Sequence, residues 1–175
     1  MQSIGRTRQS KPFIIQENLE LFSEHHIAAI FNQIGKYNLV VDDSFHTVIA
    51  PIAIEWVKTF TRENAPALSS MLLTLTYRNI TSPELESLVV KKLDEENIYR
   101  YLSLEQTVAA FVALSKHKRY LKHSLFLKLQ KVIYQQKAYY SQHPELLKAI
   151  KEGMDAVEKG GEKPMQISEA YKQIV

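Results

Sequence analysis

The chain has 175 residues, is 45% hydrophobic, carries a formal net charge of +3 and contains no cysteine. A chain of this length can bury a core without disulfide bonds, and the lack of cysteine excludes thiolate metal sites and cysteine nucleophiles. The positive charge is small for a dedicated nucleic-acid-binding protein, and no apolar run is long enough for a transmembrane helix, so we expect a protein that is not transmembrane.

Residues 1–22 form a basic N-terminal arm. Arg6, Arg8 and Lys11 all precede the first acidic residue, Glu17. Such a composition is typical of an organelle-targeting segment. It fits equally well a basic tail that binds a partner, because the arm lacks an apolar stripe. We expect a mitochondrial location, with a cytoplasmic one as the alternative.

Apolar residues recur at helical spacing along residues 23–160, with little of the strict alternation that marks strands. The first helix begins at Ser23, a good N-cap residue, and runs to Lys36. The second begins near Asp43 or Ser44 and contains Pro51, which should kink the helix or mark a late start. Together they form a first helical hairpin.

Two further hairpins follow. One begins near Asn64, and its second helix begins at Ser82, which we expect to act as a cap before a proline. The other begins at Ser103, where Gln106 completes a capping box, and its second helix begins near Ser124. The sequence thus predicts six helices in three consecutive pairs.

A last helix is predicted from Pro144 to the glycine pair Gly160-Gly161. Its mixed apolar and charged residues are typical of an element that covers the end of a repeat array. The predicted fold is therefore all-α, a short α-solenoid of about three helix-turn-helix hairpins with a C-terminal capping helix. It comprises the arm at 1–22, a helical-repeat domain at 23–160 and a tail at 161–175 with a short helix.

The first helices of the three hairpins repeat one another. Offsets of 41 and then 39 residues superpose Phe31 on Leu72 and Phe111. The same offsets superpose two more sets: Ile34, Leu75 and Leu114, and the small residues Gly35, Thr76 and Ser115. In the second helices, offsets of 41 and 44 match apolar residues equally well, so the sequence leaves that register open.

Catalytic and metal-binding motifs are missing from the sequence. No serine lies in a nucleophile-elbow motif, and the only adjacent glycines are Gly160-Gly161, so no loop is suited to cradle phosphate. The His25-His26 pair would diverge on a helix, which favours surface residues over metal ligands. Acidic pairs at helix ends are explained by capping. We therefore predict no enzyme activity, no cofactor and no metal.

The strongest chemical signal is a basic stretch without any acidic residue between Gln106 and Pro144. Interleaved tyrosines would add planar surfaces for base stacking, as in RNA-binding proteins. An acidic protein partner, anionic lipid headgroups and a merely solvated helix face fit the charge as well. The candidate surface comprises Lys116, His117, Lys118, Arg119, Tyr120, Lys122, His123, Lys128, Lys131 and Lys137.

The segments 64–93 and 102–133 resemble the degenerate helical-hairpin repeats of organellar proteins, the heptatricopeptide and FAST-kinase-like families. The resemblance covers about residues 23–140. It implies an organellar location and either RNA binding or a structural role in a large assembly. The small number of repeats and the missing nuclease-like domain argue against RNA processing. We expect a non-enzymatic accessory or scaffolding subunit whose partners are other protein subunits, with organellar RNA binding as the alternative.

Overall fold

The computed structural model describes residues 21–159, and no strand occurs among them. The prediction of an all-α protein is confirmed. Three 3₁₀ turns connect helices: η2 (Arg62–Asn64), η3 (Ile98–Tyr101) and η4 (Lys118–Tyr120). The helices are α2 (Glu24–Tyr37), the π-helical turn η1 (Phe45–Ile49), α3 (Ala50–Thr59), α4 (Ala65–Tyr77), α5 (Pro83–Glu95), α6 (Leu104–Ser115), α7 (Ser124–Gln135), α8 (Lys137–Tyr140) and α9 (Pro144–Lys159). Most of the predicted arm, and the predicted tail with its short helix, lie outside the described residues.

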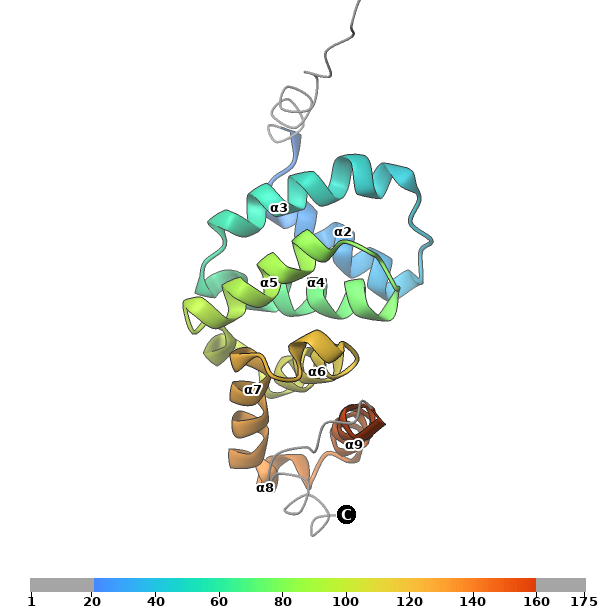
Figure 1. Cartoon of the computed structure of the whole chain (residues 1–175). Coiled ribbons are helices and arrows are strands. Elements are labelled where there is room, and N and C mark those ends of the chain that lie inside the picture. Colours follow the sequence, from blue (N-terminus) through green and yellow to red (C-terminus); the bar gives the residue numbers. More distant parts are fainter. Residues whose placement is uncertain (1–20, 160–175) are drawn as a thin grey trace, which may run out of the picture.

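The helices pack in two rows. The first row consists of α2, α4, α6 and α9, each in contact with the next. The second row consists of α3, α5 and α7, which also pack in that order. Figure 1 shows the second row running along the molecule beside the first. The core lies between the rows and between successive pairs.

Helix starts follow the predicted caps, with one exception. Ser103 and Gln106 form the expected capping box, and Ser23 forms another with His26, whose Nδ1 accepts from the Ser23 backbone N–H at 3.1 Å. Ser82, by contrast, makes no side-chain capping hydrogen bond. Ser82 is thus the N-cap residue by position, as predicted, but without the side-chain bond, and Pro83 in the first turn of α5 is the remaining start signal.

Pro51 changes the helical register of the second helix without ending it. The chain enters through the π turn η1, in which the Ala50 N–H donates to the Phe45 carbonyl. Pro51 then occupies the first turn of α3, where its missing N–H leaves no gap in the α-helical pattern. Of the two predicted outcomes, a kink or a late start, the late α-helical start is therefore found.

Burial confirms the register of the first helices. Phe31, Leu72 and Phe111 are all at most 1% exposed, and Ile34, Leu75 and Leu114 are buried as well. Equivalent positions thus face the same core in three successive helices. Helices in consecutive pairs bury one another's apolar stripe in this way in repeat proteins.

The second helices follow a different offset from either one predicted. The buried residues of α5 are Leu85, Glu86, Val89, Val90 and Leu93, and those of α7 are Leu125, Phe126, Leu129, Gln130 and Ile133, which match at an offset of 40 residues. The sequence left the register open between offsets of 41 and 44, and the buried positions match neither of these offsets as well. They matched apolar residues only, whereas two buried positions hold polar side chains, Glu86 and Gln130.

Small residues allow the first-row helices to approach closely. A Cβ atom on Gly35 would lie 2.8 Å from Thr74 Oγ1, and one on Gly153 would lie 2.7 Å from Phe111 Cε1 and 3.3 Å from Ser115 Oγ. Phe111 itself stacks on Phe126 with ring centroids 5.2 Å apart. The contact between α9 and α6 therefore depends on the absence of a side chain at Gly153.

We predict that Gly153→Ala lowers the stability of the protein. Helix propensity alone would make this change stabilising by about 1 kcal/mol. Because the new methyl group would overlap the buried Phe111 ring, we expect a net loss of about 1–3 kcal/mol instead. Urea unfolding would measure it, with Glu152→Ala on the exposed side of α9 as the control. A stabilised Gly153→Ala protein would contradict the close contact.

Candidate functional site

A groove runs along the first row of helices. It consists of two adjoining pockets of about 550 Å³ and 530 Å³. They share five lining residues from α2, α4 and α6: Asn32, Ser70, Leu73, Glu105 and Ala109. Leu146 and Ala149 of α9 line its far part. We call the two pockets together the first-helix groove.

Equivalent repeat positions line this groove. Ala28, Ser69 and Val108 occupy one set of equivalent positions, at offsets of 41 and 39 residues. Asn32, Leu73 and Val112 occupy another. Three successive helices thus present the same side to one surface, and apart from Asn32 that side carries small or apolar residues. Such a lining leaves room for the backbone of a bound chain.

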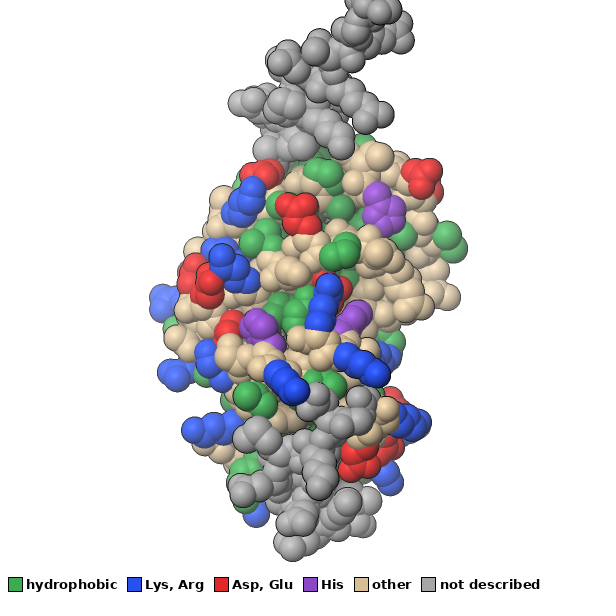
Figure 2. All heavy atoms as spheres, in the orientation of Figure 1, with side chains coloured by type: hydrophobic (Ala, Val, Ile, Leu, Met, Phe, Trp, Pro, Cys, Tyr) green, Lys and Arg blue, Asp and Glu red, His purple; other side chains and the backbone are tan. Residues whose placement is uncertain are grey.

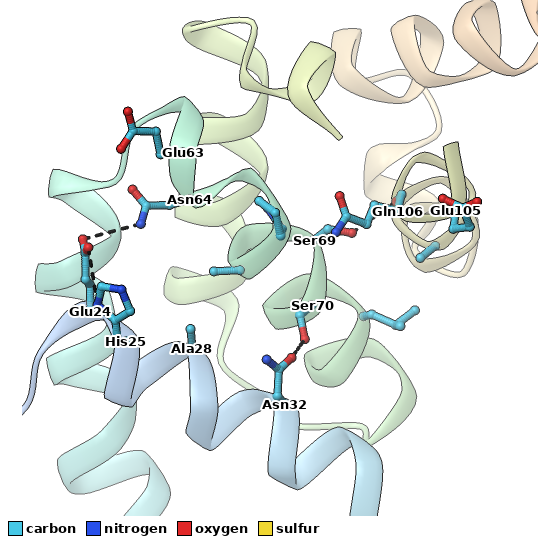
Figure 3. A pocket seen from close by; sticks show the side chains of 14 residues that line it. Glu24, His25, Ala28, Asn32, Glu63, Asn64, Ser69, Ser70, Glu105 and Gln106 are labelled. Carbon is cyan, nitrogen blue, oxygen red and sulfur yellow. Dashed lines mark hydrogen bonds and ion pairs between the residues drawn. The ribbon is translucent and has the colours of Figure 1, made fainter. Parts of the chain in front are cut away.

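The first pocket is acidic because of how its helices begin. The N-terminal ends of α2, α4 and α6 all lie at this pocket, since Glu24, Asn64 and Glu105 line it. Acidic side chains favour the positive end of a helix. Glu24, Glu105 and Glu63 of η2 are the three carboxylates that line the pocket (Figure 3). We call it the acidic pocket.

Hydrogen bonds hold two of these carboxylates in place. Glu105 accepts from Ser103 Oγ at 2.7 Å and from Tyr139 Oη at 2.8 Å. These two bonds lower the pKa of Glu105 to about 2, so its charge is kept at all physiological pH values. Glu24 Oε2 accepts from Asn64 Nδ2 at 3.5 Å. Across the pocket floor, Ser70 donates to Asn32 (Figure 3).

The second pocket lies at the C-terminal ends of α2 and α4 and beside the first half of α6, and two cations line it. Lys36, Tyr77 and Arg78 line it. Arg78 donates to the Gly35 carbonyl and to Asn38, which ties α4 to the end of α2. Basic residues favour the negative end of a helix. The groove is therefore acidic where the three helices begin, and Lys36 and Arg78 add positive charge where α2 and α4 end.

The predicted basic surface divides into a loop and a helix. Lys116, His117, Lys118, Arg119, Tyr120, Lys122 and His123 lie in the connection between α6 and α7. Figure 2 shows Lys, Arg and His side chains gathered there. Lys128 and Lys131 lie on α7 and Lys137 on α8. Several of these residues contact the preceding hairpin, which reduces the charge available to a partner.

The main contact of this loop is a buried carboxylate, Glu86 of α5. Its side chain is only 7% exposed. Arg119 Nη2 lies 2.8 Å from Glu86 Oε2, and His117 Nε2 lies 3.8 Å from Glu86 Oε1. Glu86 occupies the position at which the next hairpin has Phe126. In place of an apolar contact, the two hairpins are thus joined by an ion pair.

Other predicted residues are also engaged. Lys116 Nζ lies 3.4 Å from the centre of the exposed Tyr77 ring. Lys128 pairs with Asp94 of α5 at 2.6 Å. Burial would raise the pKa of Asp94, but hydrogen bonds from Lys128 and Ser124 lower it overall. Lys118, Lys131 and Lys137 are exposed.

The tyrosines depart from the prediction. Tyr120 is 5% exposed and Tyr140 is fully buried, so neither ring offers a surface on which a base can stack. Tyr120 instead lies between His117 and His123, with both ring centroids 6.0 Å away. Tyr134 is 42% exposed and lies near Lys137. Tyr120 therefore belongs to the core rather than to a binding surface.

Metal-binding and membrane-spanning features are not found in residues 21–159. No group of three or more potential metal ligands occurs among them. His26 caps α2, and His25 lies 3.7 Å from Glu24. No helix in the same range is long and apolar enough to cross a membrane.

No protein-family model matches the chain, and no curated protein matches its sequence.

The first-helix groove was not predicted from the sequence. Its signal was present in the repeat, because the offsets of 41 and 39 residues also align the lining positions. Aligning the residues on the exposed side of each helix at the same offsets would have indicated a continuous surface of small residues, such as Ser70 and Ala109.

We predict that Arg119→Met destabilises the protein through Glu86. The change leaves a buried carboxylate without its closest partner, and because the Arg119 side chain is 45% exposed we expect a modest loss of about 1–3 kcal/mol. Chemical unfolding measures the free energy of unfolding of Arg119→Met, with Lys118→Met, which removes an exposed cation of the same loop, as the control. Adding Glu86→Gln to Arg119→Met should restore part of the loss. Equal effects of the two single changes would contradict the ion pair.

We predict a specific acid sensitivity from Glu105. Its folded pKa of about 2 lies below the ordinary value of 4.5, so its stabilising contribution is complete above pH 4.5 and is lost as the pH falls toward 2. Glu105→Gln should therefore flatten the pH dependence of stability in that window. Thermal unfolding between pH 5 and pH 2 measures it, with the exposed Glu152→Gln as the control. An unchanged slope in Glu105→Gln would be inconsistent with these hydrogen bonds.

Proposed function

We propose that this protein is a short α-solenoid that acts without catalysis as an interaction module, binding a segment of another protein in the first-helix groove. The observation that carries the proposal is the lining of this groove by equivalent positions of three successive helices. Stacked helical repeats create extended binding surfaces of this kind. The groove has small residues at its floor and charges at both ends, which suits a polypeptide better than a compact small molecule.

In this proposal the protein is an accessory or scaffolding subunit of a larger assembly. Two features support a role within a complex. The groove offers a partner two adjoining pockets instead of one enclosed cavity. In addition, the α2–α3 connection exposes apolar side chains, including Val40 at 96% and Leu39 at 48%. The proposed mitochondrial location rests on the composition of the arm at residues 1–22.

Binding of RNA by the basic α6–α7 region is the second candidate. It is favoured by the exposed cations Lys118, Lys131 and Lys137 and by the exposed ring of Tyr134. A test of it should leave Arg119 unchanged, because a carboxylate at that position would face the buried Glu86 and perturb the fold. Changing the three lysines to glutamate removes the charge without touching that ion pair.

We predict that Ala109→Trp abolishes partner binding. Ala109 lies in both pockets of the groove, so an indole there would fill the space at its centre. Glu152→Trp places the same side chain on the exposed surface of α9, outside both pockets, and should have no effect. The measurement is the recovery of bound proteins from native extract by the full-length chain, with and without ribonuclease. Binding that survives Ala109→Trp contradicts the groove, and binding that ribonuclease removes favours the RNA candidate.

A further inference from the structure

We infer, on the basis of the proposed function, that the segment bound in the first-helix groove is basic and places lysine or arginine side chains in the acidic pocket. Three carboxylates, from Glu24, Glu63 and Glu105, line this pocket, and no lysine or arginine does so within the described part of the chain. Opposite charge in a groove of this kind sets which partners bind and how fast they associate.

Glu105 retains the capacity to bind a cation. An ionised carboxylate can accept about four hydrogen bonds, and Glu105 uses two, from Ser103 and Tyr139. These same two bonds orient the group and keep it ionised. A carboxylate that is already oriented loses less conformational entropy when a cation binds. Glu105 is therefore prepared for a cationic ligand without any rearrangement.

The same residues argue against phosphate in this pocket. Helix N-termini ordinarily attract anions through their free N–H groups and dipole. Here Glu24 and Glu105 lie in the first turns of α2 and α6 and offset that positive potential. A nucleic-acid backbone or a phosphorylated peptide would meet like charges. The acidic pocket thus selects against the anionic ligands that the basic α6–α7 loop would accept.

The floor of the groove defines the rest of the segment. Ala28, Ala67, Ser70 and Ala109 are small, and Leu73 lies among them. This floor lets a polypeptide backbone approach closely while small apolar side chains of the segment contact Leu73. The occupant is therefore a polypeptide with small apolar residues next to basic ones.

A random 12-residue peptide library displayed on phage and selected on the full-length protein tests this inference. Peptides that bind the wild-type chain but fail to bind Ala109→Trp occupy the groove. We expect lysine and arginine to exceed aspartate and glutamate in this set. Groove-dependent peptides that are acidic or uncharged would overturn the inference and leave the proposed function standing. If no peptide depends on Ala109, the proposed function fails as well.

A synthetic peptide from the selected set is then titrated against two matched variants. Glu24→Gln/Glu63→Gln/Glu105→Gln keeps the size of the three groups and one acceptor oxygen in each, and we expect affinity to fall about tenfold with most of its salt dependence lost. Glu84→Gln/Glu152→Gln/Glu158→Gln removes the same charge at exposed positions outside the groove and should bind as wild type. Circular dichroism confirms that both variants fold. Equal affinities would overturn the inference.

Two other occupants would also overturn it. A second copy in the groove would appear as self-association in sedimentation that Ala109→Trp abolishes. If the chain's own basic arm occupied the groove, the peptide would bind only after Arg6, Arg8 and Lys11 were changed to glutamate.

Discussion

The parallel packing of α2, α4 and α6 in a single register is the constraint on which the rest of the structure depends. Each helix packs against the next and buries residues at equivalent positions: Phe31 in α2, Leu72 in α4 and Phe111 in α6. A single pair of helices cannot remove that apolar side from water. Because the three helices run in the same direction, their starts share one side of the groove, and the ends of α2 and α4 lie at the other. The groove and its charge distribution both follow from this arrangement.

Polar groups join successive hairpins where apolar packing ends. Thr74 Oγ1 donates to the Phe31 carbonyl at 3.2 Å, and Ser69 Oγ donates to the Gln106 carbonyl at the same distance. Between the second and third hairpins, the ion pairs of Glu86 and Asp94 take the same role. Buried or half-buried donors and acceptors specify the register more sharply than apolar contacts, since an unpaired polar group inside costs free energy.

The sequence predicts the elements of this fold better than their contacts. Local signals suffice for helix starts such as Ser103 and for the break at Pro51, because capping and proline geometry act within a few residues. The register of the first helices is also predictable, since their buried positions are apolar. The second helices differ because Glu86 is buried through a partner 33 positions away in sequence, Arg119, which no local pattern reveals. Tyr120 was misassigned for the same reason, as its burial depends on the neighbouring hairpin.

The candidate sites show why a count of charges along the chain misjudges binding. The basic stretch lacks acidic residues of its own, yet its Arg119 and Lys128 face acidic residues of α5, so part of its charge is balanced in the folded state. The acidic residues of the groove are separated in sequence and become one group only when the helix starts are brought together. These residues also favour the positive ends of their helices. The carboxylates proposed to bind a partner therefore also stabilise the helix starts, and a substitution that tests this proposal must keep an acceptor there, as the amide oxygen of glutamine does.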